Sequence, residues 1–153
     1  MDLGPESLSS TNLLRWVAYE RDAAWTARLA ILRASRCEEI RHFGDCLREH
    51  NRHAEELVAL ARLADRTASV PKEASFITGD PFVVGAIDDA CALLDAMERL
   101  EAARIDRYVR RCGPYADQPA AMLQGLLTRH LADARSRLAR LRGLRQSRRD
   151  QAA

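Results

Sequence analysis

Two histidines three residues apart, His50 and His53, stand in a long stretch of helical periodicity. Apolar side chains recur there at steps of three and four residues from Ile40 to Ala64, and His50 is the one polar residue in that series. His53 follows one turn later and lies on the same face of the predicted helix. Imidazole nitrogens are metal ligands as well as hydrogen-bonding groups. This face therefore predicts either a pair of metal ligands or a pair of buried, hydrogen-bonded histidines.

The other three helical stretches also carry ionisable side chains on or beside their inward faces. These residues are Glu20 in the first stretch, Glu98 and Glu101 in the third, and His130 in the fourth, with Asp133 further toward solvent. Except for Asp133, each lies near the middle of its own stretch, and the middles of the helices coincide in an up-and-down bundle. The sequence therefore predicts a polar layer across the centre of the core.

A buried carboxylate without a partner costs several kcal/mol, so such a layer requires compensation. One interpretation is a mid-bundle metal site, because carboxylates and histidines on facing helices hold iron, manganese or zinc in proteins. The other is a purely structural layer without metal, in which arginines such as Arg104 or Arg129 pair with the carboxylates. The residues alone leave both interpretations open.

Helical periodicity predicts one all-α domain over about residues 9–146, with helices at about 10–34, 36–66, 81–112 and 118–146. Ser35 and Glu38 predict a capping box at the start of the second helix, and Asp80 followed by Pro81 predicts the start of the third. The connection at 67–80 is long enough to be a crossover along the bundle. Residues 1–8 are predicted to be a flexible lead and 147–153 a loose tail.

Over about 13–144 the chain resembles the ferritin-like superfamily, and most closely rubrerythrin-type bundles and small bacterial ferritin-like families of unknown function. The resemblance rests on the segments 19–24 and 50–55, on Glu101 followed by Tyr108 seven residues later, and on the long crossover. It implies a ferritin-like four-helix bundle. In that superfamily the first and third helices each supply a Glu, and the second and fourth each supply Glu-x-x-His.

The match to this ligand pattern is incomplete. Glu20, His53 and Glu101 stand at ligand positions, but His50 stands where the second helix should have its glutamate. In the fourth helix Asp133 can replace the glutamate, whereas Ser136 occupies the histidine position. The resemblance therefore implies a degenerate site rather than a complete di-iron centre, and whether the protein is an enzyme stays undecided. The implied ligands are Glu20, His50, His53, Glu101 and His130, with Glu98 and Asp133 as weaker candidates.

Net charge, motif content and cysteine spacing narrow the possible functions and the cellular location. The net charge is only +2, there is no glycine-rich phosphate loop, and no nucleophile stands beside a base in a recognised motif. The start of the chain does not resemble a signal peptide, and no apolar run is long enough to span a membrane. The four cysteines form no close pair, and three lie on or beside apolar faces, which predicts buried reduced thiols. We therefore expect a cytoplasmic protein.

Two further functions are considered. A non-enzymatic scaffold, in particular a homodimer, is suggested by Trp16 and Trp25, which fall partly off the inward face of the first helix. The arginines of the fourth helix and its tail could bind nucleic acid, but such a run is typical of a solvated helix face, and no aromatic residues interleave with it. Nucleic acid is therefore not an expected partner.

Overall fold

A computed structural model describes residues 10–67, 69–70, 89–111 and 118–153. The described residues contain four α-helices and no strand: α1 (Ser10–Arg33), α2 (Cys37–Ala64), α4 (Ala90–Arg111) and α5 (Gln118–Ala152). The predicted all-α class is thereby confirmed. None of these helices is long and apolar enough to cross a membrane.

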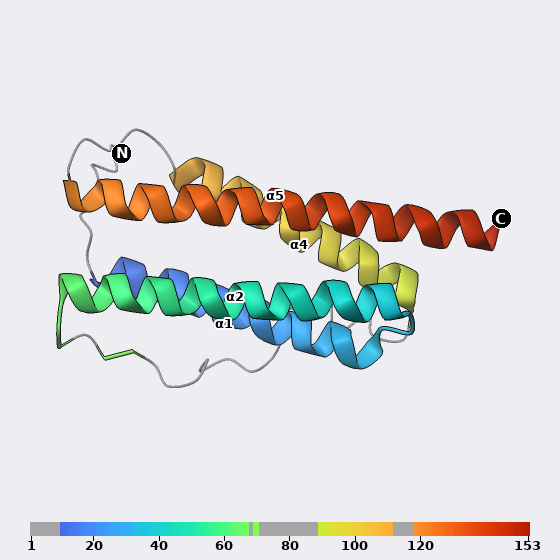
Figure 1. Cartoon of the computed structure of the whole chain (residues 1–153), viewed down its shortest axis with the longest axis horizontal. Coiled ribbons are helices and arrows are strands. Elements are labelled where there is room, and N and C mark those ends of the chain that lie inside the picture. The colour runs from blue at the N-terminus through green and yellow to red at the C-terminus, as the bar shows by residue number, and fades with distance from the viewer. Residues whose placement is uncertain (1–9, 68, 71–88, 112–117) are drawn as a thin grey trace.

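The four helices lie side by side with two of them running in each direction (Figure 1). α1 and α2 form an antiparallel hairpin, α4 packs antiparallel to α5, and α2 contacts α5. α2 ends at the end of the bundle where α1 begins, whereas α4 begins at the opposite end. These directions suit the predicted crossover. Most of that segment lies outside the described residues, so the crossover itself stays a prediction.

The start of α4 differs from the prediction. The carboxylate of Asp89 accepts hydrogen bonds from the backbone N–H groups of Cys91 (2.8 Å) and Ala92 (3.3 Å), which satisfies two of the free donors at the start of a helix. The described helix therefore begins at Ala90 rather than near residue 81. The predicted cap at Asp80 and Pro81 lies outside the described residues.

The predicted capping box before α2 is wrong. Arg36 occupies the N-cap position and makes no side-chain capping hydrogen bond. The Ser35 hydroxyl instead accepts a hydrogen bond from Arg148 of α5 at 2.8 Å. A contact from a distant helix has therefore replaced the local interaction on which the prediction relied.

The predicted loose tail at 147–153 is also wrong, because α5 continues to Ala152. Arg145 of α5 pairs with Asp95 (2.5 Å) and with Glu98 of α4, and Arg148 pairs with Glu39 of α2. Glu39 is buried, so its partner is held in place. Ion pairs to neighbouring helices extend α5 beyond the point where its apolar pattern ends.

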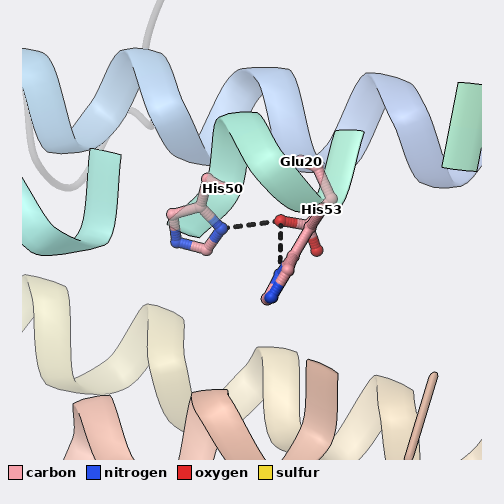
Figure 2. Close-up of side chains that lie close together, drawn as sticks. All are labelled: Glu20, His50 and His53. Atoms are coloured by element: carbon pink, nitrogen blue, oxygen red, sulfur yellow. Dashed lines mark hydrogen bonds and ion pairs between the residues drawn. The ribbon is translucent and has the colours of Figure 1, made fainter. Parts of the chain in front are cut away.

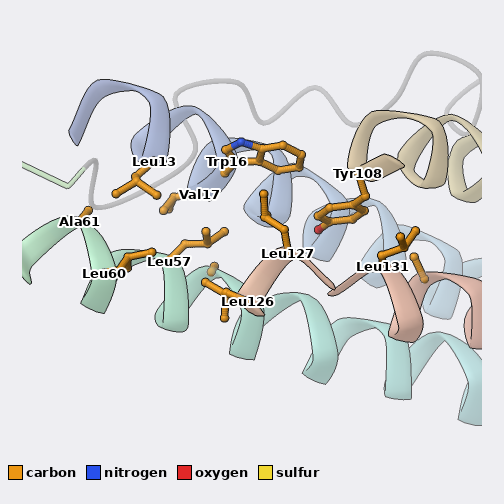
Figure 3. Packing of buried hydrophobic residues seen from close by; sticks show 12 residues of the cluster. Leu13, Trp16, Val17, Leu57, Leu60, Ala61, Tyr108, Leu126, Leu127 and Leu131 are labelled. Atoms are coloured by element: carbon orange, nitrogen blue, oxygen red, sulfur yellow. The ribbon is translucent and has the colours of Figure 1, made fainter. Parts of the chain in front are cut away.

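Two apolar clusters fill the interior, one on each side of the polar layer. Figure 3 shows the first, which includes Leu13, Val17, Leu57, Tyr108 and Leu127. The second includes Phe43, Leu94, Met97 and Leu141. Along α2, His50 and His53 stand between Phe43 of one cluster and Leu57 of the other. Burying each large apolar side chain contributes roughly 1.5–3 kcal/mol to stability. The two clusters therefore stabilise the packing of the four helices around the polar layer.

Some residues of the predicted inward faces are placed differently. Ile40 is 42% exposed, and the buried positions in that part of α2 include His42 and Cys46. Cys37 and Cys91 are exposed, so among the described cysteines the prediction of a buried thiol holds only for Cys46. Cys112 lies outside the described residues.

The tryptophans of α1 do not form an exposed pair. Trp16 is buried and stacks on Tyr108 with ring centroids 5.0 Å apart and an interplanar angle of 19°. Trp25 is half-buried, with the guanidinium of Arg28 5.8 Å from its ring centroid. Trp16 therefore belongs to the core, and the prediction that it anchors an interface is wrong.

Candidate metal centre

Glu20 of α1 meets His50 and His53 of α2 in the centre of the bundle. All three side chains are buried, and each offers one ligand atom within 4.8 Å of the other two. Figure 2 shows both imidazoles directed at one carboxylate oxygen, with Glu20 Oε2 lying 2.6 Å from His50 Nδ1 and 3.5 Å from His53 Nδ1. The histidines share a helix face because they are three residues apart. The structure therefore brings together three of the predicted ligands.

The second oxygen of Glu20 is held by Tyr108. The phenol of Tyr108 donates a hydrogen bond to Glu20 Oε1 across the bundle from α4. Burial by itself raises the pKa of Glu20, but the hydrogen bond from His50 and the nearby charge of Arg104 outweigh it, and the pKa lies well below its ordinary value. Glu20 is thus an ionised carboxylate with Oε2 facing the two imidazoles.

Each of the two histidines also faces a carboxylate with its other ring nitrogen. Nε2 of His53 lies 2.8 Å from Oδ2 of Asp133, which is also bound by Arg52 at 2.8 Å. Nε2 of His50 lies 3.7 Å from Oε1 of Glu101 and 3.4 Å from Nη1 of Arg104, which can only donate. Carboxylates placed behind ligand histidines orient the ring and direct the unprotonated nitrogen inward. For His53 this arrangement suits an imidazole that presents Nδ1 to a cation, whereas Nδ1 of His50 donates to Glu20 and would release its proton to a metal ion.

Nδ1 of His53 is the polar atom that the protein leaves unsatisfied here. It is buried and has no hydrogen-bond partner among the described residues. When Nε2–H donates to Asp133, Nδ1 carries a lone pair and faces the ionised Glu20 at 3.5 Å. Two acceptors that face each other in a buried site require a proton or a metal ion between them.

Glu101, a predicted ligand, is placed differently. Its Oε1 accepts hydrogen bonds from Arg104 Nη1 (2.9 Å) and from Arg137 Nε (3.0 Å). Burial raises its pKa, but the charges of Arg104 and Arg137 outweigh this, so the pKa lies far below its ordinary value. Two guanidinium groups therefore neutralise Glu101, as the metal-free interpretation expected for Arg104. Arg129, the other arginine considered there, is exposed.

His130 lies behind the cluster rather than in it. Its ring stacks on His53 with centroids 3.6 Å apart and an interplanar angle of 15°. Its Nε2 lies 2.8 Å from Oε2 of Glu56, and its Nδ1 has no hydrogen-bond partner among the described residues. Burial and the neighbouring His53 lower the pKa of His130 to about 4. His130 is therefore a neutral ring that supports His53.

The two weaker candidates also fall outside the cluster. Asp133 contacts the outer nitrogen of His53, as described above. Glu98 points away from the layer and pairs with Arg142 (3.0 Å) and Arg145 at the edge of the bundle. The prediction of Glu98 as a layer residue is wrong, because its position on α4 directs it toward α5 rather than toward α1 and α2.

Three site residues were missed by sequence analysis. Arg137 is fully buried and also donates to Glu49 at 2.7 Å, and Glu56 binds His130. Arg137 stands three residues after Ala134 and four before Leu141, both buried, so its register already marked an inward position. No comparable sequence signal marks Glu49 or Glu56, because both lie beside the inward face of α2.

Five arginines of α5 form ion pairs with neighbouring helices. Those paired with carboxylates of α2 or α4 are Arg137, Arg140, Arg142, Arg145 and Arg148. Their charges are balanced by acidic side chains of the same chain. These ion pairs therefore stabilise the packing of α5 against α2 and α4.

Comparison of the chain with family models, with curated proteins and with solved structures found no match.

Proposed function

We propose that the protein is a ferritin-like four-helix bundle that binds one divalent metal ion, iron, manganese or zinc, through Glu20, His50 and His53. One observation carries the proposal: one carboxylate oxygen and two imidazole nitrogens converge in a buried site, and the nitrogen of His53 lacks a partner. Two imidazoles and one carboxylate are the protein ligands of mononuclear iron(II) sites and of several zinc sites.

The surroundings of the three ligands support this function. Tyr108 holds Oε1 of Glu20, which leaves Oε2 as the oxygen available to a metal. Asp133 stands behind the imidazole of His53 and favours the tautomer that presents Nδ1. With only three protein ligands, positions on the ion stay open to water or to another small ligand. The ferritin-like assignment is supported by the sequence resemblance and by the directions of the four helices.

Metal titration with thermal unfolding tests this proposal. Purified protein, stripped with a chelator and then given Fe²⁺, Mn²⁺ or Zn²⁺, should bind one equivalent per chain. Free metal at about 100 times the dissociation constant should stabilise the fold by about 2.7 kcal/mol. For a chain of this size that corresponds to a rise in Tm of about 5–10 °C.

Variants locate the site. His53→Ala and Glu20→Gln should each abolish the metal-dependent rise in Tm. His42→Ala is the matched control, because His42 is a buried histidine of the same helix outside the cluster, and this variant should keep the rise. Binding of less than a tenth of an equivalent of every metal, or equal responses of all three variants, would refute the assignment.

A second candidate is a metal-free helical scaffold, in particular a homodimer. It is favoured by the guanidinium groups of Arg104 and Arg137, which balance Glu101 without any metal. The scaffold requires that chelator and added metal leave Tm unchanged. It also requires a dimer in light scattering at tens of micromolar protein, and a monomer with no metal response would exclude it.

A further inference from the structure

Three aromatic side chains connect the candidate metal centre with the surface. Tyr108 is fully buried, and its phenol donates a hydrogen bond to Glu20, the carboxylate that faces the two imidazoles. The ring of Tyr108 stacks on Trp16 of α1 with centroids 5.0 Å apart (Figure 3). Trp16 meets Tyr19 edge to face with centroids 6.2 Å apart, and Tyr19 is 46% exposed. The order from the inside to the outside is therefore Glu20, Tyr108, Trp16 and Tyr19.

We propose that these three rings carry single electrons from the centre to a one-electron acceptor at Tyr19, an inference that rests on the proposed metal site. Tyrosine and tryptophan are the aromatic side chains that one-electron oxidants attack most readily. Transfer between rings in contact is fast, because its rate falls exponentially with distance. Glu20 and His50 are 1% exposed and His53 is 0% exposed, so an acceptor larger than a few atoms cannot touch the centre. The rings supply a connection where direct contact is blocked.

Charges at the two ends of the series favour electron flow toward the surface. The guanidinium of Arg107 lies 3.9 Å from the ring centroid of Tyr19, and its positive charge disfavours an electron vacancy on that ring. At the inner end, the ionised carboxylate of Glu20 contacts the phenol of Tyr108 and stabilises an electron vacancy there. Burial raises the pKa of Tyr108, and the charge of Glu20 raises it further, with smaller opposite effects from two nearby guanidinium groups. The vacancy therefore moves inward and the electron moves outward.

Electrons and protons balance along this path. The acceptor takes one electron from Tyr19, which releases its phenolic proton to water and regains both when Trp16 reduces it. Trp16 in turn regains an electron from Tyr108, whose phenolic proton passes to Oε1 of Glu20. With iron(II) bound, Tyr108 recovers an electron from the ion and the proton from Glu20. The net change is one electron transferred from iron(II) to the acceptor.

The first experiment needs no metal. Chelator-stripped protein is oxidised with a photogenerated ruthenium(III) bipyridine complex, a one-electron oxidant too large to enter the core, and radicals are measured by electron paramagnetic resonance. The parent should form a persistent tyrosyl radical, because a buried ring cannot dimerise. Tyr108→Phe should remove this radical, and Trp16→Phe should lower its yield by at least an order of magnitude. Trp25→Phe, at the other tryptophan of α1, is the matched control and should leave the yield unchanged.

The second experiment uses the iron(II)-loaded chain without oxygen. Hexachloroiridate(IV) is added in a stopped-flow instrument, and its absorption reports the rate of electron transfer. Trp16→Phe should bind iron as the parent does but lose electrons more slowly by at least an order of magnitude, whereas Trp25→Phe should match the parent. The zinc-loaded chain, whose ion has no redox chemistry, measures direct oxidation of the rings, and this background is subtracted.

The outcomes separate this inference from the proposed function. If the stripped parent forms the radical through Trp16 but no metal binds, the proposed site fails and the electron path stands. If Trp16→Phe equals the parent in radical yield or, where iron binds, in the rate of electron loss, the inference is overturned. Folding is checked by circular dichroism. Should Trp16→Phe fail to fold, a fluorinated tryptophan at position 16 in the Trp25→Phe background keeps the ring shape, is harder to oxidise and carries the same expectation.

Discussion

Acid should destabilise the bundle through His130. The pKa of this histidine is lowered from its ordinary value of 6.5 to about 4, first by burial and then by the stacked ring of His53. As the pH falls below 6.5, His130 becomes protonated in the unfolded chain but stays neutral in the folded chain. The stability that depends on neutral His130 is therefore fully present above about pH 6.5 and is lost as the pH falls toward 4.

The size of the effect follows from the shift. A change in pKa from 6.5 to about 4, at about 1.4 kcal/mol per unit, corresponds to roughly 3 kcal/mol of unfolding free energy. Most of it should be lost between about pH 7 and about pH 4.5, above the range in which the buried carboxylates titrate. The lowered pKa values of Glu20 and Glu101 act in the same direction at lower pH.

Urea unfolding of the parent chain and of His130→Gln, both in chelator, measures this contribution. Glutamine cannot titrate, but its amide can still donate to Glu56. The difference in unfolding free energy between parent and variant should therefore fall by roughly 2–3 kcal/mol as the pH is lowered from about 7 to about 4.5. His42, whose pKa is also lowered by burial, is present in both chains and cancels. Parallel stability curves over this range would refute the assignment.

Further predictions concern individual contacts. Tyr108→Phe removes the hydrogen bond to a buried, ionised carboxylate and should cost about 2 kcal/mol in urea unfolding, whereas Tyr19→Phe, at a ring 46% exposed, should change little. Arg148→Met leaves the buried carboxylate of Glu39 unpaired and should lower the free energy of unfolding by about 1–3 kcal/mol. Arg149→Met, one residue further along the same helix, should change it by no more than about 0.5 kcal/mol. Equal effects of the two substitutions would contradict the role of the ion pair. Cys46 is buried and its pKa is raised to about 12, so peptide mass spectrometry after maleimide treatment should show rapid labelling of the exposed cysteines of α2 and α4 and labelling of Cys46 only after unfolding.

The sequence by itself determined the helices and the level at which polar groups enter the core. The periodicity of three and four residues placed Glu20, His50, His53 and Glu101 on inward faces, and the structure buries all four. Such patterns can be read locally, because the orientation of a side chain around its own helix depends only on residues within a few turns.

The partners of these side chains were decided by the tertiary structure. Whether Glu101 faces a metal ligand or a guanidinium depends on the rotation and axial position of α4 relative to α5, and the sequence pattern of one helix contains neither. The same holds for Glu98, which turns toward the arginines of α5 although it stands three residues from Glu101. Because arginine and glutamate side chains are long, each could reach several partners, and only the packing of the neighbouring helix selects one.

The length of α5 shows the same division. Its apolar pattern ends near Leu144, and local periodicity gave no reason to extend the helix to Ala152. Arg145 and Arg148 extend it through ion pairs with acids that are distant in sequence and close only in the folded bundle. Apolar periodicity is a property of one helix, whereas charge pairing involves two. The sequence therefore predicted the bundle, and only the tertiary structure showed which arginines pair with the buried carboxylates.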